Sequence, residues 1–161
     1  MPEITLRAAN SKDAPALLRL IRALAAYEKM SPDIPFTEAE VQARLLQPDS
    51  RTHTVIAEAA GEPIGFALYY YGAATFFDVR WLVIEAIYVD SPMRKLGIGT
   101  HILRQLAAKA VGEGCVRVEW SVLAWNQPAI DFYERMGATP RNDFLNYRLE
   151  GEALRVLAAS A

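Results

Sequence analysis

Hydrophobic residues recur at helical spacing in the first third of the chain. The apolar positions that share one helix face after residue 13 are Leu17, Leu18, Ile21, Leu24 and Ala25. Side-chain oxygens within residues 10–13 can cap this helix, which we expect to end near Met30. The threonine that opens residues 37–46 caps a second short helix, with Glu40 as its capping-box partner. The pattern predicts two amphipathic helices after a short strand at residues 5–8.

The pattern changes to strand-like runs in the middle of the chain. Residues 54–57 and 64–70 are predominantly apolar and are separated by turn residues at 60–63, which predicts an antiparallel hairpin. Residues 81–89 are apolar at every position except Glu85, a pattern typical of a central strand covered on both faces. A carboxylate in such a strand is therefore a candidate for chemistry.

A loop, a helix and further strands follow this central strand. A glycine-containing loop at residues 94–100 leads into a helix whose apolar face ends at Gly112. Apolar and polar residues then alternate through residues 116–122, and a right-handed crossover would place this strand parallel to the central one. A short helix at 128–136 and a last strand at 145–149 complete the predicted elements.

These elements and the composition predict one globular domain. We expect an α/β (α+β) fold over residues 1–161, with a mixed, mostly antiparallel central sheet flanked by about four helices. The chain is 52% hydrophobic and 22% charged, which excludes disorder, and its net charge of −2 provides no basic surface for nucleic acid.

The single cysteine and the N-terminus point to the cytoplasm. Cys115 has no partner for an internal disulfide, which suits a reducing compartment. The N-terminus lacks signal-peptide features, and no apolar run reaches the ~20 residues that cross a bilayer. With only two histidines, His53 and His101, the chain also lacks the ligand spacing of a zinc site, so we expect no metal.

Two segments contain residues suited to ligand binding. Arg94-Lys95-Leu96-Gly97-Ile98-Gly99-Thr100 joins a strand to a helix, where backbone N–H groups can approach a phosphate. It matches neither a P-loop nor a dinucleotide fingerprint, and the alternative is a glycine turn without a ligand. In the segment 125–138, Asn126 can cap a short helix that carries Tyr133.

Together these segments resemble two motifs of the GNAT superfamily of N-acetyltransferases. The glycine loop is similar to the motif that binds the coenzyme A pyrophosphate, and residues 126–138 are similar to the motif N-x-x-A-x-x-F-Y-x-x-x-G-(A/F). The resemblance implies the GNAT fold, in which a parallel strand pair splays apart, and acetyl-CoA as cosubstrate. It also implies a homodimer, with residues 145–149 and 151–161 as the candidate interface.

Within that superfamily the chain resembles the spermidine/spermine (diamine) or thialysine acetyltransferase group. The matching segments are Ala26-Tyr27-Glu28, residues 65–70, Glu85 and Trp125-Asn126. At Ala86 the chain departs from the Glu-Asp pair typical of diamine acetyltransferases, which weakens the polyamine interpretation. The resemblance covers residues 5–150 and implies a primary amine of a small molecule as the acceptor: a polyamine, a diamine or a lysine-like amine.

The chemistry of acetyl transfer assigns roles to two of these residues. A primary amine with a pKa of about 10.4 must lose a proton before it attacks the thioester. Glu85 is the candidate base, acting directly or through a water, and burial would strengthen it as a base. Tyr133 is the candidate acid for the departing thiolate. The alternatives are a solvent-facing Glu85 and a Tyr133 that only packs in the core.

The resemblance also implies the binding residues. The backbone of Ile87, Tyr88 and Val89 would run along the pantetheine arm, with the Ile87 N–H near the thioester carbonyl. The remaining residues expected to bind the cosubstrate are Arg94, Lys95, Leu96, Gly97, Ile98, Gly99, Thr100, Asn126 and Tyr133. The residues expected to bind the acceptor amine are Tyr27, Glu28, Glu85 and Trp125, with Asp33 and Asp78 as further acidic candidates.

Two other functions remain open from the sequence. The chain could be a non-catalytic acyl-CoA-binding regulatory module, in which Glu85→Gln and Tyr133→Phe change nothing measurable. It could also be a GNAT enzyme that acts on a protein or on an antibiotic amine.

Overall fold

The computed structural model describes residues 3–30, 35–75, 78–143 and 145–160. The chain divides into two compact units, Met1–Leu123 and Ala124–Ala161. The predicted Asp33 lies outside the described residues. The prediction of a single domain stays a prediction.

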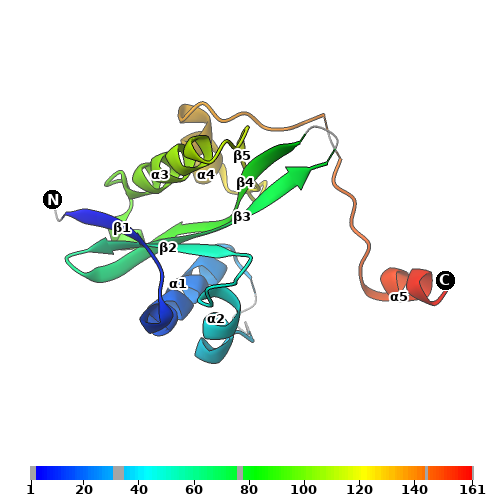
Figure 1. The fold of residues 1–161 in the computed structure, drawn as a ribbon, viewed down its shortest axis with the longest axis horizontal. Coiled ribbons are helices and arrows are strands. Elements are labelled where there is room, and N and C mark those ends of the chain that lie inside the picture. The colour runs from blue at the N-terminus through cyan, green and yellow to red at the C-terminus, as the bar shows by residue number, and fades with distance from the viewer. Residues whose placement is uncertain (1–2, 31–34, 76–77, 144, 161) are drawn as a thin grey trace. The chain divides into compact units, whose positions relative to one another are not determined.

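The first unit is built on one sheet (Figure 1). Among the described residues, five strands lie in the order β1-β2-β3-β4-β5. Their bounds are β1 Ile4–Ala8, β2 His53–Ala59, β3 Glu62–Ala74, β4 Val79–Val89 and β5 Val118–Trp120. The pairs β1–β2, β2–β3 and β3–β4 are antiparallel, whereas β4–β5 is parallel. The predicted mixed, mostly antiparallel sheet is confirmed.

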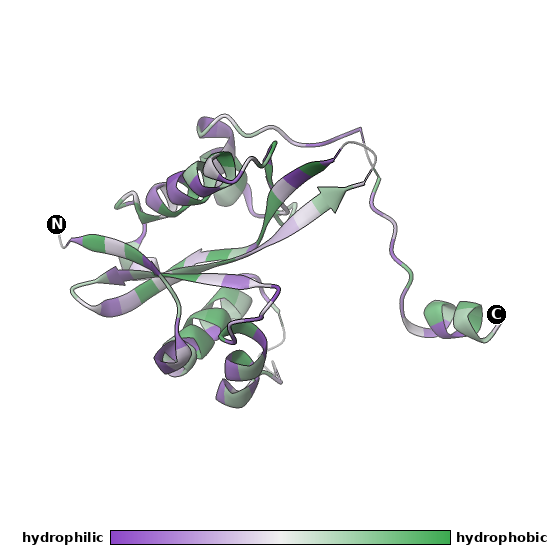
Figure 2. Cartoon of the chain, viewed as in Figure 1, coloured by the Kyte–Doolittle hydropathy of each residue, from purple (hydrophilic) through white to green (hydrophobic). Residues whose placement is uncertain are grey.

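Helices cover both faces of this sheet (Figure 1). Helices α1 (Ala14–Tyr27) and α2 (Glu38–Leu45) lie on one face, and α3 (Ile98–Gly112) lies on the other. Figure 2 shows hydrophobic and hydrophilic residues on each of these helices, as the amphipathic pattern predicts. Short 3₁₀ helices at Ser11–Asp13 and Ser91–Met93 precede α1 and α3.

Local capping sets where the 3₁₀ helix before α1 and helix α2 begin. The Asn10 side chain accepts from Lys12 N, while Asn10 N donates to Asp13. Thr37 and Glu40 form the predicted capping box at the start of α2. Each box satisfies backbone donors that have no partner within the helix.

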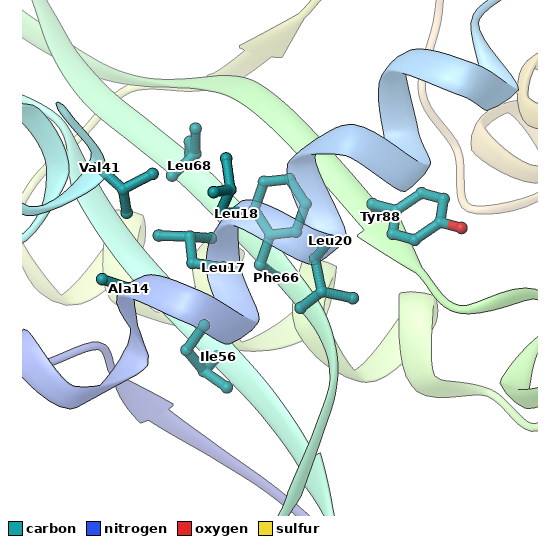
Figure 3. Close-up of a cluster of buried hydrophobic side chains, with 9 residues drawn as sticks. All are labelled: Ala14, Leu17, Leu18, Leu20, Val41, Ile56, Phe66, Leu68 and Tyr88. Atoms are coloured by element: carbon teal, nitrogen blue, oxygen red, sulfur yellow. The ribbon is translucent and has the colours of Figure 1, made fainter. Parts of the chain in front are cut away.

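A hydrophobic cluster holds α1 and α2 against the sheet (Figure 3). Phe66 of β3 is fully buried among side chains of α1, α2 and β2, and Tyr88 joins the cluster from β4. Burying each such side chain stabilises the fold by about 1.5–3 kcal/mol. The same packing fixes the end of β4 relative to α1, which matters for the site.

The second unit differs from the prediction. It contains α4 (Gln127–Arg135) and α5 (Gly151–Ala159), of which α5 was not expected. Residues 145–149 form no strand, so the predicted last strand is wrong. The structure describes these residues without strand geometry, and Leu145 and Tyr147 are 79% and 91% exposed.

Candidate active site

The central strand β4 carries a bulge at Glu85. Leu68 of β3 pairs with Ala86, and the next residue, Tyr69, pairs with Ile84, so Glu85 is the extra residue. Bulges bend a strand, redirect a side chain and occur often beside active sites. Here the bulge leaves Glu85 exposed, and the expected burial of this carboxylate is therefore wrong.

The pairing of β4 with its parallel neighbour β5 ends beside the bulge. The β4–β5 register ends at the pair Ile84–Trp120. Beyond it, Ile87, Tyr88 and Val89 pair with β3 and with no other strand among the residues that the structure describes. The predicted parallel pairing of these two strands is thus confirmed, and their splaying stays a prediction. The edge of β4 that faces away from β3 can accept an extended chain there, as an added strand would bind.

The glycine loop follows this open stretch of β4. Gly97 has a φ of 80° and stands immediately before α3, and it has no side chain to cap the helix. The first bond within α3 is donated by His101 N to Gly97 O. The N–H groups of Ile98, Gly99 and Thr100 precede that bond and have no acceptor within the helix. Such N–H groups at a helix start favour binding of an anion.

Arg94 does not extend from the loop toward solvent. Its guanidinium carbon lies 4.5 Å from the ring centroid of Tyr27 and 5.3 Å from that of Tyr88. Its Nε donates a 3.0 Å hydrogen bond to the carbonyl of Val89. The structure thereby brings together the end of α1, which is predicted to bind the acceptor, and the end of β4, which is predicted to bind the cosubstrate. Lys95, the next residue, has an exposed side chain.

The end of α1 is held by its own backbone. Lys29 N donates to Ala26 O and Met30 N to Ala25 O, while Lys29 adopts a left-handed φ of 58°. This is a Schellman arrangement, with lysine where glycine is usual. It fixes the direction of Glu28, which is half-buried, and desolvation raises the pKa of the Glu28 carboxyl. Asp78 is exposed in the turn before β4.

The second unit contains the other predicted site residues. Asn126 is buried and its side chain accepts from Ala129 N, so its predicted capping role at α4 is confirmed. The half-buried ring of Tyr133 lies 5.3 Å from that of Phe132, and Trp125 is exposed. The catalytic pairing of Tyr133 with Glu85 stays a prediction.

Sequence reasoning missed two features of the site. The bulge at Glu85 depends on the cross-strand register, and the Arg94–Tyr27 contact joins residues far apart in the chain. The only sequence signal for the bulge was a polar residue in an apolar strand. No spacing rule connects the loop arginine to the end of the first helix.

A cavity elsewhere in the first unit does not involve the predicted site. A cavity of about 670 Å³ is lined by parts of β1, α2, β2 and α3, and none of the predicted site residues lines it. Within the described ranges, no group of three His, Cys, Asp or Glu residues could hold a metal ion. None of the helices described is long and apolar enough to span a bilayer.

Comparisons with known proteins identify the family. Thialysine N-epsilon-acetyltransferase of Sus scrofa is 36% identical over 98% of this chain and 99% of its own length. L-ornithine N5-acetyltransferase of Arabidopsis thaliana is 34% identical over 78% of this chain and 51% of its own length. A solved integron cassette protein from the mobile metagenome of V. cholerae shares the fold with a TM-score of 0.81, at 23% identity over 96% and 97% of the two chains. Residues 19–138 match the acetyltransferase (GNAT) family. The chain belongs to this family and is an acyltransferase.

Proposed function

We propose that the protein transfers the acetyl group of acetyl-CoA to the side-chain amine of a small, lysine-like molecule, by direct attack in a ternary complex. The observation that carries this proposal is the end of the β4–β5 pairing at Ile84, followed further along the chain by the uncapped start of α3 at Gly97. An open strand edge and a phosphate-binding loop in succession suit a long, extended thioester. The full-length similarity to thialysine acetyltransferases supports the choice of acceptor.

The cosubstrate would bind along these two features. The pyrophosphate would accept from the N–H groups of residues 98–100, with the loop residues 95–97 around it. The pantetheine arm would pair with the free edge of residues 87–89. Asn126 supports this site indirectly, because it caps the helix that carries Tyr133.

The transfer itself needs a base, an oxyanion donor and an acid. Glu85, directly or through a water, takes the proton that the ammonium group loses, and its exposure lets that proton pass to bulk water. The amine nitrogen bonds to the thioester carbon while the Ile87 N–H stabilises the carbonyl oxygen. As the C–S bond breaks, the Tyr133 hydroxyl gives its proton to the sulfur, and the second proton that the acylated nitrogen loses restores the hydroxyl.

Residue 86 favours a lysine-like amine over a polyamine. Ala86 is half-buried and packs against the hydrophobic cluster around Phe66. Glu28 and Glu85 are then the acidic residues proposed to meet the acceptor, and Trp125 and Tyr27 are proposed to shape its pocket. Two carboxylates suit one terminal ammonium group better than the several charges of spermine. Ornithine, the substrate named for the Arabidopsis relative, has the same terminal group.

Release of the coenzyme A thiol tests this function. Acetyl-CoA is mixed in turn with thialysine, lysine, ornithine, spermidine, putrescine, an aminoglycoside and a short peptide. We expect turnover with the amino acids and at least ~100-fold slower turnover in Glu85→Gln and Tyr133→Phe. Glu62→Gln, an exposed carboxylate in the β2–β3 hairpin, is the matched control. Binding of acetyl-CoA without any turnover would instead support a regulatory module.

The second unit supports a homodimer in the cytoplasm as part of this proposal. Apolar side chains of residues 145–149 and of α5 are exposed, namely Leu145, Tyr147, Leu149, Leu154, Val156 and Leu157. So much exposed apolar surface on one segment favours burial against a second copy. Light scattering on the wild type and on Leu145→Asp with Tyr147→Asp tests it, with a monomeric variant expected. The single free cysteine suits a reducing compartment.

A further inference from the structure

We propose that Arg94 is a positioning residue for the acceptor amine: its guanidinium holds the Tyr27 end of α1 in place and does not serve as a phosphate-binding charge. The inference rests on the proposed function, because it concerns the acceptor side of the same site. It assigns to the glycine loop a second task besides holding the cosubstrate.

On the β4 side, Arg94 contacts residues that the core holds in place. Tyr88 is 8% exposed and belongs to the hydrophobic cluster of Figure 3, so its ring cannot move without disturbing the core. The Nε bond to the Val89 carbonyl sets the plane of the guanidinium. A planar cation between two rings is a geometry that arginine satisfies and lysine reproduces poorly.

On its other side, Arg94 contacts Tyr27, the last residue of α1. The Tyr27 ring lies 4.5 Å from the guanidinium carbon, and Glu28 follows directly as the helix cap. Because the Schellman bonds of Lys29 and Met30 leave little freedom after Tyr27, a shift of the Tyr27 ring moves Glu28 as well. Glu28 is the half-buried carboxylate proposed to hold the acceptor ammonium group.

The exposure of the two basic side chains in the loop agrees with separate roles for them. The Arg94 side chain is half-buried against aromatic rings, whereas Lys95 is exposed at the next position. Among the described residues of the loop, Lys95 is therefore the cation available to a pyrophosphate. Arg94 and Lys95, adjacent in sequence, would act on different substrates.

Steady-state kinetics of Arg94→Lys distinguishes the two roles. This variant keeps the charge and loses the planar stack. We expect the KM for the amine to rise about threefold to tenfold, the range of a cation–π contact, and the KM for acetyl-CoA to stay within about twofold. Lys95→Gln should show the opposite pattern. A rise confined to the acetyl-CoA KM in Arg94→Lys would overturn the inference.

A double-mutant cycle tests whether Arg94 acts through Tyr27. We expect Tyr27→Leu and the double variant with Arg94→Lys to raise the amine KM by about the same factor, because both remove one contact. The matched control is Arg19→Lys, since Arg19 also links α1 to the end of β4 through Asp90 at 2.8 Å. It should leave the amine KM within about twofold. Independent, multiplying effects of the Tyr27 and Arg94 changes would overturn the inference.

Urea unfolding of the same four proteins needs no substrate. Each single variant changes the unfolding equilibrium constant by some factor. Because both changes remove the same Arg94–Tyr27 contact, the factor for the double variant should be about threefold to tenfold smaller than the product of the two single factors. Fully multiplicative shifts would refute the contact. A wild type that acetylates no amine would refute the proposed function, whereas this unfolding cycle would still decide whether Arg94 holds the Tyr27 end of α1.

Discussion

Replacing Glu28 with glutamine should weaken acceptor binding and stabilise the fold at the same time. The side chain is half-buried at the Schellman-capped end of α1, and desolvation raises the pKa of its carboxyl. The charge therefore costs folding free energy, and the proposed site uses it to bind an ammonium group. Glutamine keeps the shape and removes the charge.

The magnitude for binding follows from one charge-assisted hydrogen bond. Such a bond contributes about 1.5–3 kcal/mol, and about 1.4 kcal/mol corresponds to tenfold in affinity. The KM for the amine in Glu28→Gln should rise about tenfold to a hundredfold, with the KM for acetyl-CoA nearly unchanged. Because the carboxylate must be ionised, the wild-type KM for the amine should also rise as the pH falls through the raised pKa.

The sign of the stability effect follows from linkage. A carboxyl whose pKa is raised in the folded state binds its proton more tightly there than in the unfolded chain. Below its ordinary value of 4.5 both states are protonated, so the burial has no charge cost. Above the raised pKa the cost is complete. The unfolding free energy of Glu28→Gln should therefore exceed that of the wild type at pH 7, and this gain should disappear toward pH 4.5.

Initial-rate kinetics and urea unfolding measure the two effects on the same preparations. Glu62→Gln removes an exposed carboxylate and should change the amine KM by less than twofold and the stability by less than ~0.5 kcal/mol. An unchanged amine KM in Glu28→Gln would refute the proposed acceptor role. A loss of more than ~1 kcal/mol would show that Glu28 supports the fold instead.

Three further predictions concern the scaffold of the site. Asp13→Ala should lower the free energy of unfolding in urea by about 3 kcal/mol, because the buried carboxylate accepts from both terminal nitrogens of Arg7. Arg7 also lowers the pKa of the Asp13 carboxyl, so the stability that this pair provides should decrease as the pH drops below the ordinary pKa of 3.8. Ala60→Asn should raise the unfolding free energy by about 0.5–1 kcal/mol, because Ala60 and Gly61 both have positive φ in the β2–β3 turn; an unchanged midpoint would contradict this. Phe66→Ala should cost about 3–5 kcal/mol, and a loss under ~1 kcal/mol would mean that the cluster of Figure 3 is not the core.

The sequence predicted the elements whose causes are local. The capping box of Thr37 and Glu40, the amphipathic faces of α1 and α3, and the β2–β3 hairpin all follow from residues within a few positions of one another. The parallel pairing of β4 with β5 followed from the handedness of one crossover. The glycine loop and the segment around Tyr133 were found because their motifs are contiguous.

The prediction failed where an alternating pattern had two interpretations. Residues 145–149 alternate as a half-buried strand does, yet the structure describes them as exposed and without strand geometry. Such a pattern states only that one side is apolar. Whether that side is buried depends on a neighbour, which the pattern does not identify.

The sequence by itself determined the family, the order of the elements and the positions of the glycine loop and of Glu85, because all of these depend on short-range patterns. Only the tertiary structure decided that Glu85 stands exposed on a bulge, since a bulge arises from the register of β4 against β3. It also decided that Arg94 lies on Tyr27 and Tyr88, because the core packing of α1 against the sheet brings the loop and the end of that helix together. Contacts between distant segments depend on how the apolar faces of helices and sheet pack together, and this packing depends on residues throughout the core.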